Sequence, residues 1–232
     1  MNNVFLGRLT LQDSNSYGGS KYVFVKTKGQ KNSWRPLLGG IVMNAPTGGN
    51  QKMFQGDLVE YQTDGKNGRI YLLKTYEVNA NVAADGVAIQ IKRDEYRHIP
   101  EVGEVLMKAT NTLTGTGAGY AITAIDSTHS DYWVVTLGTT IGALSAGDIL
   151  VQAKAAGAAV QMMVTNPNAF MDIDSIFKMP TTNADNNAIY TYTPIMHEIA
   201  WISRMAKLPA CILALNKSNV KDTEGNDIWF QI

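Results

Sequence analysis

The residues with the clearest chemical potential are two aspartates that alternate along the chain, Asp172 and Asp174. In an extended segment, side chains at this spacing point to the same side. The two carboxylates would repel unless water separates them or a cation such as calcium bridges them. Further oxygen ligands are not evident nearby, which favours a solvated loop over an ion site. The sequence therefore predicts no metal site and no bound cofactor.

The histidines and the single cysteine show no spacing typical of catalysis or metal binding. His98, His129 and His197 are far apart in sequence, and none stands at metal-ligand spacing from another histidine or from Cys211. We expect His98 to be a structural residue in a turn. Cys211 lies in an apolar run without a basic neighbour, which favours a small buried side chain over a nucleophile. A lone cysteine also excludes an intrachain disulfide, which suits a reducing cytoplasm.

Known catalytic motifs are absent from the sequence as well. Gly115, Gly117 and Gly119 do not complete the GxGxxG pattern that cradles phosphates, and no G-x-S-x-G nucleophile elbow occurs. We therefore predict that the chain is not an enzyme. A small hydrolase with a loop-built site is an alternative, because active sites assemble from residues far apart in sequence. It would need a pocket that holds at least two of His98, His129, Asp172 and Asp174.

The charge balance argues against nucleic acid as a partner, because bulk binding to phosphates needs a basic field or patch. The 232 residues carry 20 basic and 20 acidic side chains, and charged residues make up only 17%. This low share fits a protein that covers part of its surface with partners, or simply a β-protein rich in uncharged polar residues. Residues 1–110 are basic (14 − 10 = +4) and residues 111–232 are acidic (6 − 10 = −4).

The densest basic run lies near the N-terminus, between positions 21 and 35, and contains no acid. We interpret it as part of an arm that docks on an acidic partner surface, because complementary charge fixes the register of a contact. The alternative is a solvated strand face and loop. The predicted contact residues are Lys21, Lys26, Lys28, Lys31, Trp34, Arg35 and Pro36.

Alternating apolar and polar residues predict a mainly β fold. Two Asx-Gly pairs between apolar runs, Asp64-Gly65 and Asn67-Gly68, predict a β-hairpin, since such pairs supply the positive φ of tight turns. Short strand patterns at 104–108, 120–125, 132–137, 148–152 and 160–164, separated by turn clusters such as 114–119, predict a small barrel or sandwich. We expect N-terminal strands and an extended, loop-rich arm over 1–56, the hairpin region over 57–97, the compact domain over 98–165 and a C-terminal segment over 166–232.

A local pattern of glycine, acid and two aliphatic residues occurs at positions 56–59, 103–106 and 147–150. The flanking sequences do not match one another. We interpret the pattern as a turn that leads into a strand rather than as an internal repeat.

The C-terminal segment contains the one convincing helix pattern. Thr193 can cap a helix, and Pro194 suits its first position. Apolar residues then recur at helical spacing as far as Lys207. We predict one helix over 194–207, a strand over 210–215, and a terminal strand over 228–232 that is paired inside a sheet.

No secretion or membrane signal is evident in the sequence. The N-terminus lacks a long apolar stretch behind a basic start, and the longest nearly apolar stretch, 155–164, is too short to span a bilayer. We therefore expect no membrane partner and synthesis in the cytoplasm.

Aromatic residues offer a second alternative function. Four tryptophans and ten tyrosines could supply a stacking platform for sugars or bases. Trp133 falls in a strand pattern, so we expect it to anchor a core or an interface. An exposed Trp133 or Tyr120 clustered with Asp131 would instead favour a receptor-binding or carbohydrate-binding fibre domain.

Several short segments are recognisable in order along the chain. They are 55–61, 71–76, 98–100, 105–107, 121–126, 142–153, 166–170, 208–218 and the pair Trp229-Phe230. Together they resemble auxiliary capsid or head-fibre proteins of crAss-like tailed bacteriophages. The resemblance covers residues 55–232, whereas residues 1–54 match less clearly.

The resemblance implies a virion role without catalysis. Such proteins bind the assembled shell, commonly as symmetric oligomers. The implied partners are the major capsid protein of the same phage, other virion proteins and further copies of the chain, with a trimer as one arrangement. The implied location is the phage head, after synthesis in the cytoplasm of the bacterial host. Extended arms and strand edges suit this role, because an added strand satisfies edge N–H and C=O groups.

Overall fold

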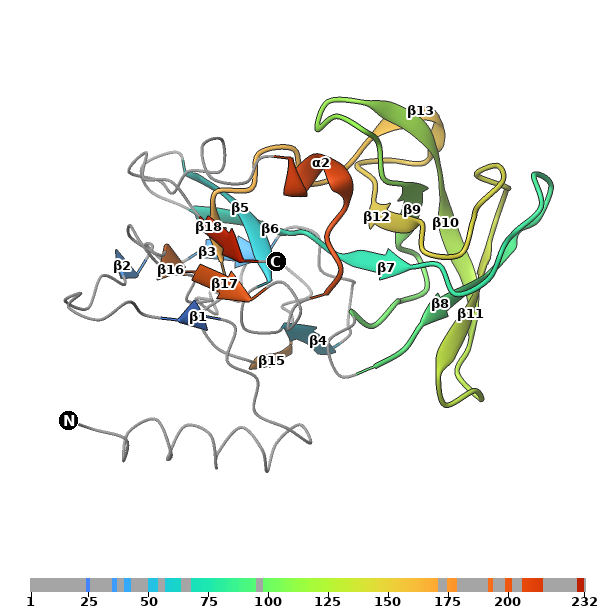
Figure 1. Cartoon of the computed structure of the whole chain (residues 1–232), viewed down its shortest axis with the longest axis horizontal. Coiled ribbons are helices and arrows are strands. Elements are labelled where there is room, and N and C mark those ends of the chain that lie inside the picture. The colour runs from blue at the N-terminus through green and yellow to red at the C-terminus, as the bar shows by residue number, and fades with distance from the viewer. Residues whose placement is uncertain are drawn as a thin grey trace.

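In the computed structural model the chain is mainly β, as its sequence predicts (Figure 1). Within the described ranges, strands form four sheets and one short helix, α2 (Ala210–Leu213), is present. The structure describes residues 24–25, 35–36, 40–42, 50–53, 57–63, 68–94, 98–170, 175–178, 192–193, 199–201, 206–214 and 229–231.

The largest sheet forms a sandwich on the right of Figure 1. Its strand order is β7-β12-β9-β10-β11-β8, with β13 paired to β10, and its ladders are antiparallel. Three of the five strands predicted for the compact domain are confirmed to within one residue, β9, β11 and β12. Strand β10 begins at Thr116, inside the predicted turn cluster, and β13 ends at Gln161, so the prediction of a strand over 160–164 is wrong beyond that residue. Strands β7 and β8 join them in the same sheet. The strands are β7 (Thr75–Glu77), β8 (Ala88–Lys92), β9 (Val105–Lys108), β10 (Thr116–Asp126), β11 (Tyr132–Leu137), β12 (Ile149–Gln152) and β13 (Gly157–Gln161).

Strand β10 belongs to both layers of the sandwich. Its first half pairs with β9 and β13, and its second half pairs with β11. Its register shifts at 117–119 and again at 122–124, and such bulges bend a strand. At the two ends of the strand order, β7 and β8 form no ladder, and the chain after β7 meets β8 at an isolated bridge between Val78 and Ile91. The sheet therefore curls into a sandwich-like shape and does not close into a barrel through a continuous ladder.

Close packing requires glycine at position 119. A Cβ atom there would lie 2.8 Å from Val160 Cγ2 and 3.2 Å from Ala153 Cβ. Three strands meet at this residue, since Gly119 pairs with Met107 of β9 and with Gly157 of β13. The glycine-rich run that falls short of a phosphate-binding motif thus allows strands to approach one another.

Two apolar cores lie on opposite faces of strands β9 and β12. Leu106 and Leu150 belong to the inner core of the sandwich. The next residue on each strand, Met107 or Val151, belongs to an outer core that also contains Ile212 of α2. Successive residues of a strand point to opposite faces, so both faces are buried here. This explains why these strands are continuous apolar runs in the sequence.

A second sheet contains the predicted hairpin, which is confirmed. Val59 of β5 pairs with Leu72 of β6, and the antiparallel ladder continues to Thr63 and Gly68. The sheet order is β2-β16-β14-β5-β6-β3. These strands are β2 (Arg35–Pro36), β3 (Gly40–Val42), β5 (Leu58–Thr63), β6 (Gly68–Leu72), β14 (Ala169–Phe170) and β16 (Tyr192–Thr193).

The two smaller sheets also join early and late parts of the chain. The order β1-β17-β18 links β1 (Phe24–Val25) with β17 (Ile199–Trp201) and β18 (Trp229–Gln231). Strand β4 (Asn50–Met53) pairs with β15 (Ser175–Lys178). The described parts of the predicted N-terminal arm are thus strands paired with later segments. The predicted pairing of the C-terminal strand is confirmed, since β18 pairs with β17 at the edge of this sheet.

The helix predicted over 194–207 is wrong at 199–201, which form strand β17. Its neighbours β1 and β18 supply hydrogen-bond partners on both sides, and this pairing overrides the helical spacing of apolar residues. Positions 194–198 and 202–205 lie outside the described residues.

The strand predicted over 210–215 is wrong as well, because helix α2 begins at Ala210, directly after Pro209. Leu208, Cys211 and Ile212 are buried in the outer core. Cys211 and Ile212 belong to α2, and Leu208 lies just before it, so burial of this apolar run does not require a strand. Among the described helices, none is long and apolar enough to cross a membrane.

Candidate functional site

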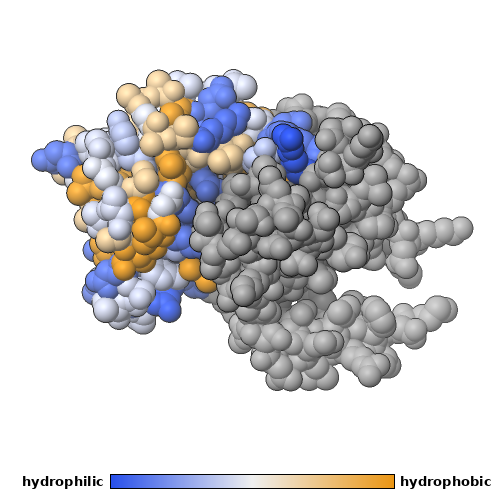
Figure 2. Space-filling view, turned by 180° about the vertical axis from the view of Figure 1, so that it is seen from behind, coloured by the Kyte–Doolittle hydropathy of each residue, from blue (hydrophilic) through white to orange (hydrophobic). Residues whose placement is uncertain are grey.

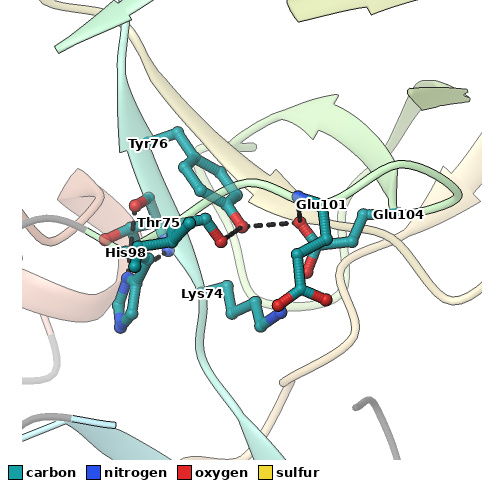
Figure 3. A network of polar contacts seen from close by, with 7 residues as sticks. Lys74, Thr75, Tyr76, His98, Glu101 and Glu104 are labelled. Atoms are coloured by element: carbon teal, nitrogen blue, oxygen red, sulfur yellow. Dashed lines mark hydrogen bonds and ion pairs between the residues drawn. The ribbon is translucent and has the colours of Figure 1, made fainter. Parts of the chain in front are cut away.

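A network of ionisable side chains is buried inside the sandwich, next to the inner core (Figure 3). Lys74 directly precedes β7 and Glu104 directly precedes β9, and β12 lies between these strands. Lys74 Nζ contacts Glu104 Oε1, and the two side chains are only 1% and 2% exposed. Tyr76 Oη donates a hydrogen bond to Glu104 Oε2 at 2.6 Å. Because residues two apart on a strand share a face, Lys74 and Tyr76 both reach the same carboxylate.

A second carboxyl group stands beside this contact. The Glu101 backbone N–H donates to Glu104 Oε2 at 3.3 Å, so this oxygen accepts from both Glu101 and Tyr76. Burial raises the pKa of the Glu101 side chain above its usual value; the charge of Lys74 opposes this and that of Glu104 adds to it. Burial, followed by the charge of Glu104, raises the pKa of Tyr76 well above its usual value. The Tyr76 hydroxyl therefore keeps its proton and remains a donor.

His98 ties the loop before β9 to two other segments. The Thr75 N–H donates to His98 Nδ1 at 3.0 Å, and His98 Nε2 lies 3.2 Å from Asp57 Oδ1. Nδ1 also lies 3.2 Å from the Thr75 carbonyl oxygen. Both His98 and Asp57 are buried. His98 thus joins the loop to β7 and to the start of β5, which agrees with the structural role predicted for it.

Two further buried glutamates link segments that are distant in sequence. Glu77 of β7 pairs with Lys92 of β8 at 2.7 Å and with Lys207, which precedes α2, at 3.2 Å. Glu60 of β5 accepts the backbone N–H groups of Thr165 and Asn166 at 2.8 Å and 2.9 Å. Glu60 also accepts a hydrogen bond from Gln62 Nε2 at 2.6 Å. Each carboxylate thus compensates its burial by contacting two or more partners.

The glycine–acid pattern marks turns that lead into strands, as predicted. Gly103 and Gly147 have φ values of 95° and 89°, which side chains other than glycine rarely adopt. Glu104 and Asp148 follow them and directly precede β9 and β12. The same local pattern thus gives one fully buried acid and one that remains partly exposed.

The two described histidines lie in different environments. His129 is exposed in the turn between β10 and β11, where its ring stacks on Tyr132 at 4.3 Å between centroids. Its Nε2 lies 4.0 Å from Asp126 Oδ2. His98 is buried among other partners, so the structure does not bring these two together. Three remaining candidates, Asp172, Asp174 and His197, lie outside the described residues.

Trp133 is a core residue, as predicted. Its side chain is buried in the inner core, and the Arg93 guanidinium lies 5.2 Å from the centre of its ring. Arg93 also donates to the carbonyl oxygens of Ser127 and His129. Trp133 therefore presents no exposed stacking face of the kind that would favour a carbohydrate-binding domain. Cys211 is also buried as predicted, and burial raises the pKa of its thiol.

Of the predicted capsid-contact residues, the structure describes the backbone of two, Arg35 and Pro36. They form β2, which pairs with Thr193 and Tyr192 of β16. The others lie outside the described residues: Lys21, Lys26, Lys28, Lys31 and Trp34.

Sequence reasoning missed the buried network. A signal for it exists in Lys74, which interrupts the apolar run Leu72-Leu73 before Tyr76. A lysine in a strand that is otherwise apolar indicates a buried partner, because an unpaired buried charge is costly. The identity of the partner, Glu104, was not readable from local sequence, since the two residues are 30 positions apart.

The architecture and the network together define the class of protein as a mainly β, sandwich-containing protein with an ionic core. No protein-family model matches the chain, and no curated protein matches it.

Proposed function

We propose that the chain is a structural protein of a phage virion. It is either an auxiliary (decoration) capsid protein or a head-fibre protein. In both cases it binds the major capsid protein of the same phage. It is made in the cytoplasm of the bacterial host and ends on the phage head. The segments over 55–232 that resemble such proteins support the proposal, as does the mainly β architecture.

The observation that carries the proposal is an anchored loop with exposed apolar residues. The loop over 98–103 is held by His98 at one end and by the Glu101–Glu104 hydrogen bond at the other. Between these anchors, Ile99 is 44% exposed and Val102 is 60% exposed. Apolar side chains on a fixed backbone lose little conformational freedom when a partner covers them. Such a loop suits docking onto another protein.

The surface of the sandwich supports the same proposal. Figure 2 shows apolar side chains grouped over the described part of the molecule when it is seen from behind. Exposed apolar patches are typical of surfaces that bind other proteins. We further propose that copies of the chain associate, with a trimer as one arrangement, and that other virion proteins are additional partners. The basic run from Lys21 to Arg35 would then dock on acidic surfaces of the shell.

The use of the buried acids supports a structural class of function. Glu60, Glu77 and Glu104 each contact groups from other segments of the chain. These carboxylates stabilise the relative positions of strands and loops. Such contacts between segments would stabilise a protein that must withstand mechanical and chemical stress on a particle.

Binding to purified phage heads tests the proposal. We expect the chain to copurify with intact heads at high copy number and to rebind heads from which it has been stripped. Val102→Asp should weaken rebinding at least tenfold, because it places a charge in a desolvated contact. Val87→Asp is the matched control, since Val87 is 36% exposed and lies in a different segment.

Two outcomes would contradict the proposal. A chain absent from intact heads would exclude the virion role itself. Equal rebinding by Val102→Asp and by the unaltered chain would remove the loop from the contact. Neutralising Lys21, Lys26, Lys28, Lys31 and Arg35 together tests the basic run separately, and unchanged rebinding would exclude it as a contact.

A further inference from the structure

We propose that the sandwich forms an internal covalent cross-link, an amide bond between Lys74 Nζ and the side-chain carboxyl carbon of Glu104, which the chain makes itself with release of one water. This inference does not rest on the virion role. It concerns the chemistry of the buried network, and its test uses the isolated chain.

The first support is the position of the two reacting groups. Lys74 Nζ contacts Glu104 Oε1, and both side chains are excluded from solvent. Figure 3 shows the Lys74 side chain directed from the β7 segment toward the carboxylates of the network. Reactants held in contact inside a fold behave as if they were at very high concentration, which favours condensation. Exclusion of water also disfavours the reverse reaction, hydrolysis.

The second support is the direct contact between Lys74 Nζ and Glu104 Oε1, across which the proton of the reaction can move. Transfer of one proton from the Lys74 ammonium to the Glu104 carboxylate removes both charges at once. It leaves a neutral amine, which is a nucleophile, next to a neutral carboxyl group, which is an electrophile. The ion pair and the reactive neutral pair therefore differ only in whether one proton is on Lys74 Nζ or on Glu104 Oε1.

The third support is a ready site for the developing negative charge. Glu104 Oε2 accepts a hydrogen bond from Tyr76 Oη at 2.6 Å and one from the Glu101 N–H at 3.3 Å. When the amine adds to the carboxyl carbon, this oxygen becomes the oxyanion of the tetrahedral intermediate. Two donors already directed at it stabilise that charge without rearrangement. Tyr76 keeps its proton, as its raised pKa requires.

The bonds and protons of the step balance. The nitrogen lone pair of Lys74 forms the C–N bond, and the C–O bond to Glu104 Oε1 breaks. The side chain of Glu101 takes a proton from the nitrogen and returns one to the leaving Oε1 hydroxyl, which departs as water. No oxidant or reductant takes part. The raised pKa of Glu101 suits a group that both accepts and gives a proton.

The bond would connect the segments before β7 and β9 across the intervening strand β12. A cross-link there closes the covalent loop over 74–104. Closing a loop restricts the unfolded chain more than the folded one, so it would stabilise the sandwich.

Intact-mass measurement of the purified full-length chain tests the proposal. The expected mass is lower than the sequence mass by one water. Trypsin should fail to cleave after Lys74, and fragmentation should find a branched peptide that joins the segments containing Lys74 and Glu104. A chain with the full sequence mass, or with Lys74 and Glu104 in separate unmodified peptides, overturns the proposal even if no variant folds.

Variants separate this bond from other losses of water. Asp-Gly sequences such as Asp64-Gly65 also dehydrate, and that loss would persist in Lys74→Met. We expect Lys74→Met to restore the full mass. Lys108→Met, which removes the solvent-facing lysine paired with Asp148, should keep the loss. A water loss retained in Lys74→Met overturns the proposal.

A separate measurement tests the roles of Tyr76 and Glu101 in forming the bond. Tyr76→Phe and Glu101→Gln should each slow formation of the cross-link at least tenfold. The measurement is the fraction of cross-linked chain at a fixed time after synthesis. Normal rates in both variants would exclude the assisted mechanism.

Discussion

Two lysine–carboxylate pairs in the sandwich share a local sequence pattern and differ in environment. Glu104 and Asp148 each follow a glycine turn and directly precede a strand. Glu104 contacts Lys74 out of reach of solvent, whereas Asp148 pairs with Lys108 at 2.7 Å where the lysine is 47% exposed. The turn is thus a local property of the sequence, whereas the solvent exposure of the ion pair is not.

Solvent decides what each pair contributes. Water and salt screen the exposed pair, so its two charges gain little from each other. The buried pair has lost its hydration, and each charge depends on the other. Removing one lysine therefore leaves a solvated carboxylate at Asp148 but an uncompensated buried carboxylate at Glu104.

The largest effect is expected for Lys74→Met, which should lower the free energy of unfolding by about 3–5 kcal/mol. Lys108→Met is the matched control and should cost about 0–1 kcal/mol. Urea unfolding followed by tryptophan fluorescence measures both. The ranking also holds with the amide bond in place, because Lys74→Met removes that bond. Equal losses in the two variants would show that burial does not distinguish the pairs.

Gly119→Val is expected to have the next largest effect, a loss of about 1–3 kcal/mol from overpacking. The added side chain would meet Val160 and Ala153 where three strands converge. Gly138→Ala provides the control, since the nearest atom to its Cβ would be the Thr123 methyl at 3.6 Å. Thermal unfolding should show a clear drop in Tm for the first variant alone. A similar Tm for both would mean that the strands can separate at low cost.

The pH dependence of stability should show the smallest effects, with opposite signs in the two regions. Burial, opposed by Lys74 and increased by Glu104, raises the pKa of Glu101. The folded chain thus holds this proton to higher pH than the unfolded chain. Its contribution to stability is complete below the ordinary glutamate pKa and is lost as pH rises to the raised value.

Asp148 should behave in the opposite way. Burial acts to raise the pKa of Asp148. Hydrogen bonds from the Lys108 side chain and the Ser145 N–H, together with the charge of Lys108, outweigh burial and lower this pKa. Its contribution is present above the ordinary aspartate pKa and is lost as pH falls to the lowered value. Unfolding free energies measured across the acidic range should change slope in opposite directions for Glu101→Gln and Asp148→Asn. Slopes of the same sign would contradict the assignment.

Much of the fold was predictable from local patterns. Strand β11 was expected over 132–137 and has those bounds, because its apolar and polar residues alternate strictly. The hairpin of β5 and β6 followed from two Asx-Gly pairs. The burial of Trp133 and Cys211 followed from the apolar runs around them. Each of these features depends on residues that are near one another in sequence.

The errors occurred where distant segments decided the outcome. Residues 199–201 have helical spacing of apolar residues, yet they pair with β1 from one end of the chain and β18 from the other. Residues 210–213 look like a strand, yet they pack as a helix on the outer face of β9 and β12. Local propensity is weak compared with the free energy of sheet pairing and burial, so tertiary context prevailed.

The sequence by itself determined the mainly β character, the turns before β9 and β12, and the positions of most strands in the sandwich. These follow from side-chain alternation and from glycine at positive φ, which act over a few residues. Only the tertiary structure decided that Lys74 and Tyr76 meet Glu104 across β12, and that Asp148 stays partly exposed beside Lys108. Strand order sets which side chains meet and which are dehydrated, and that order depends on contacts between segments far apart in the chain.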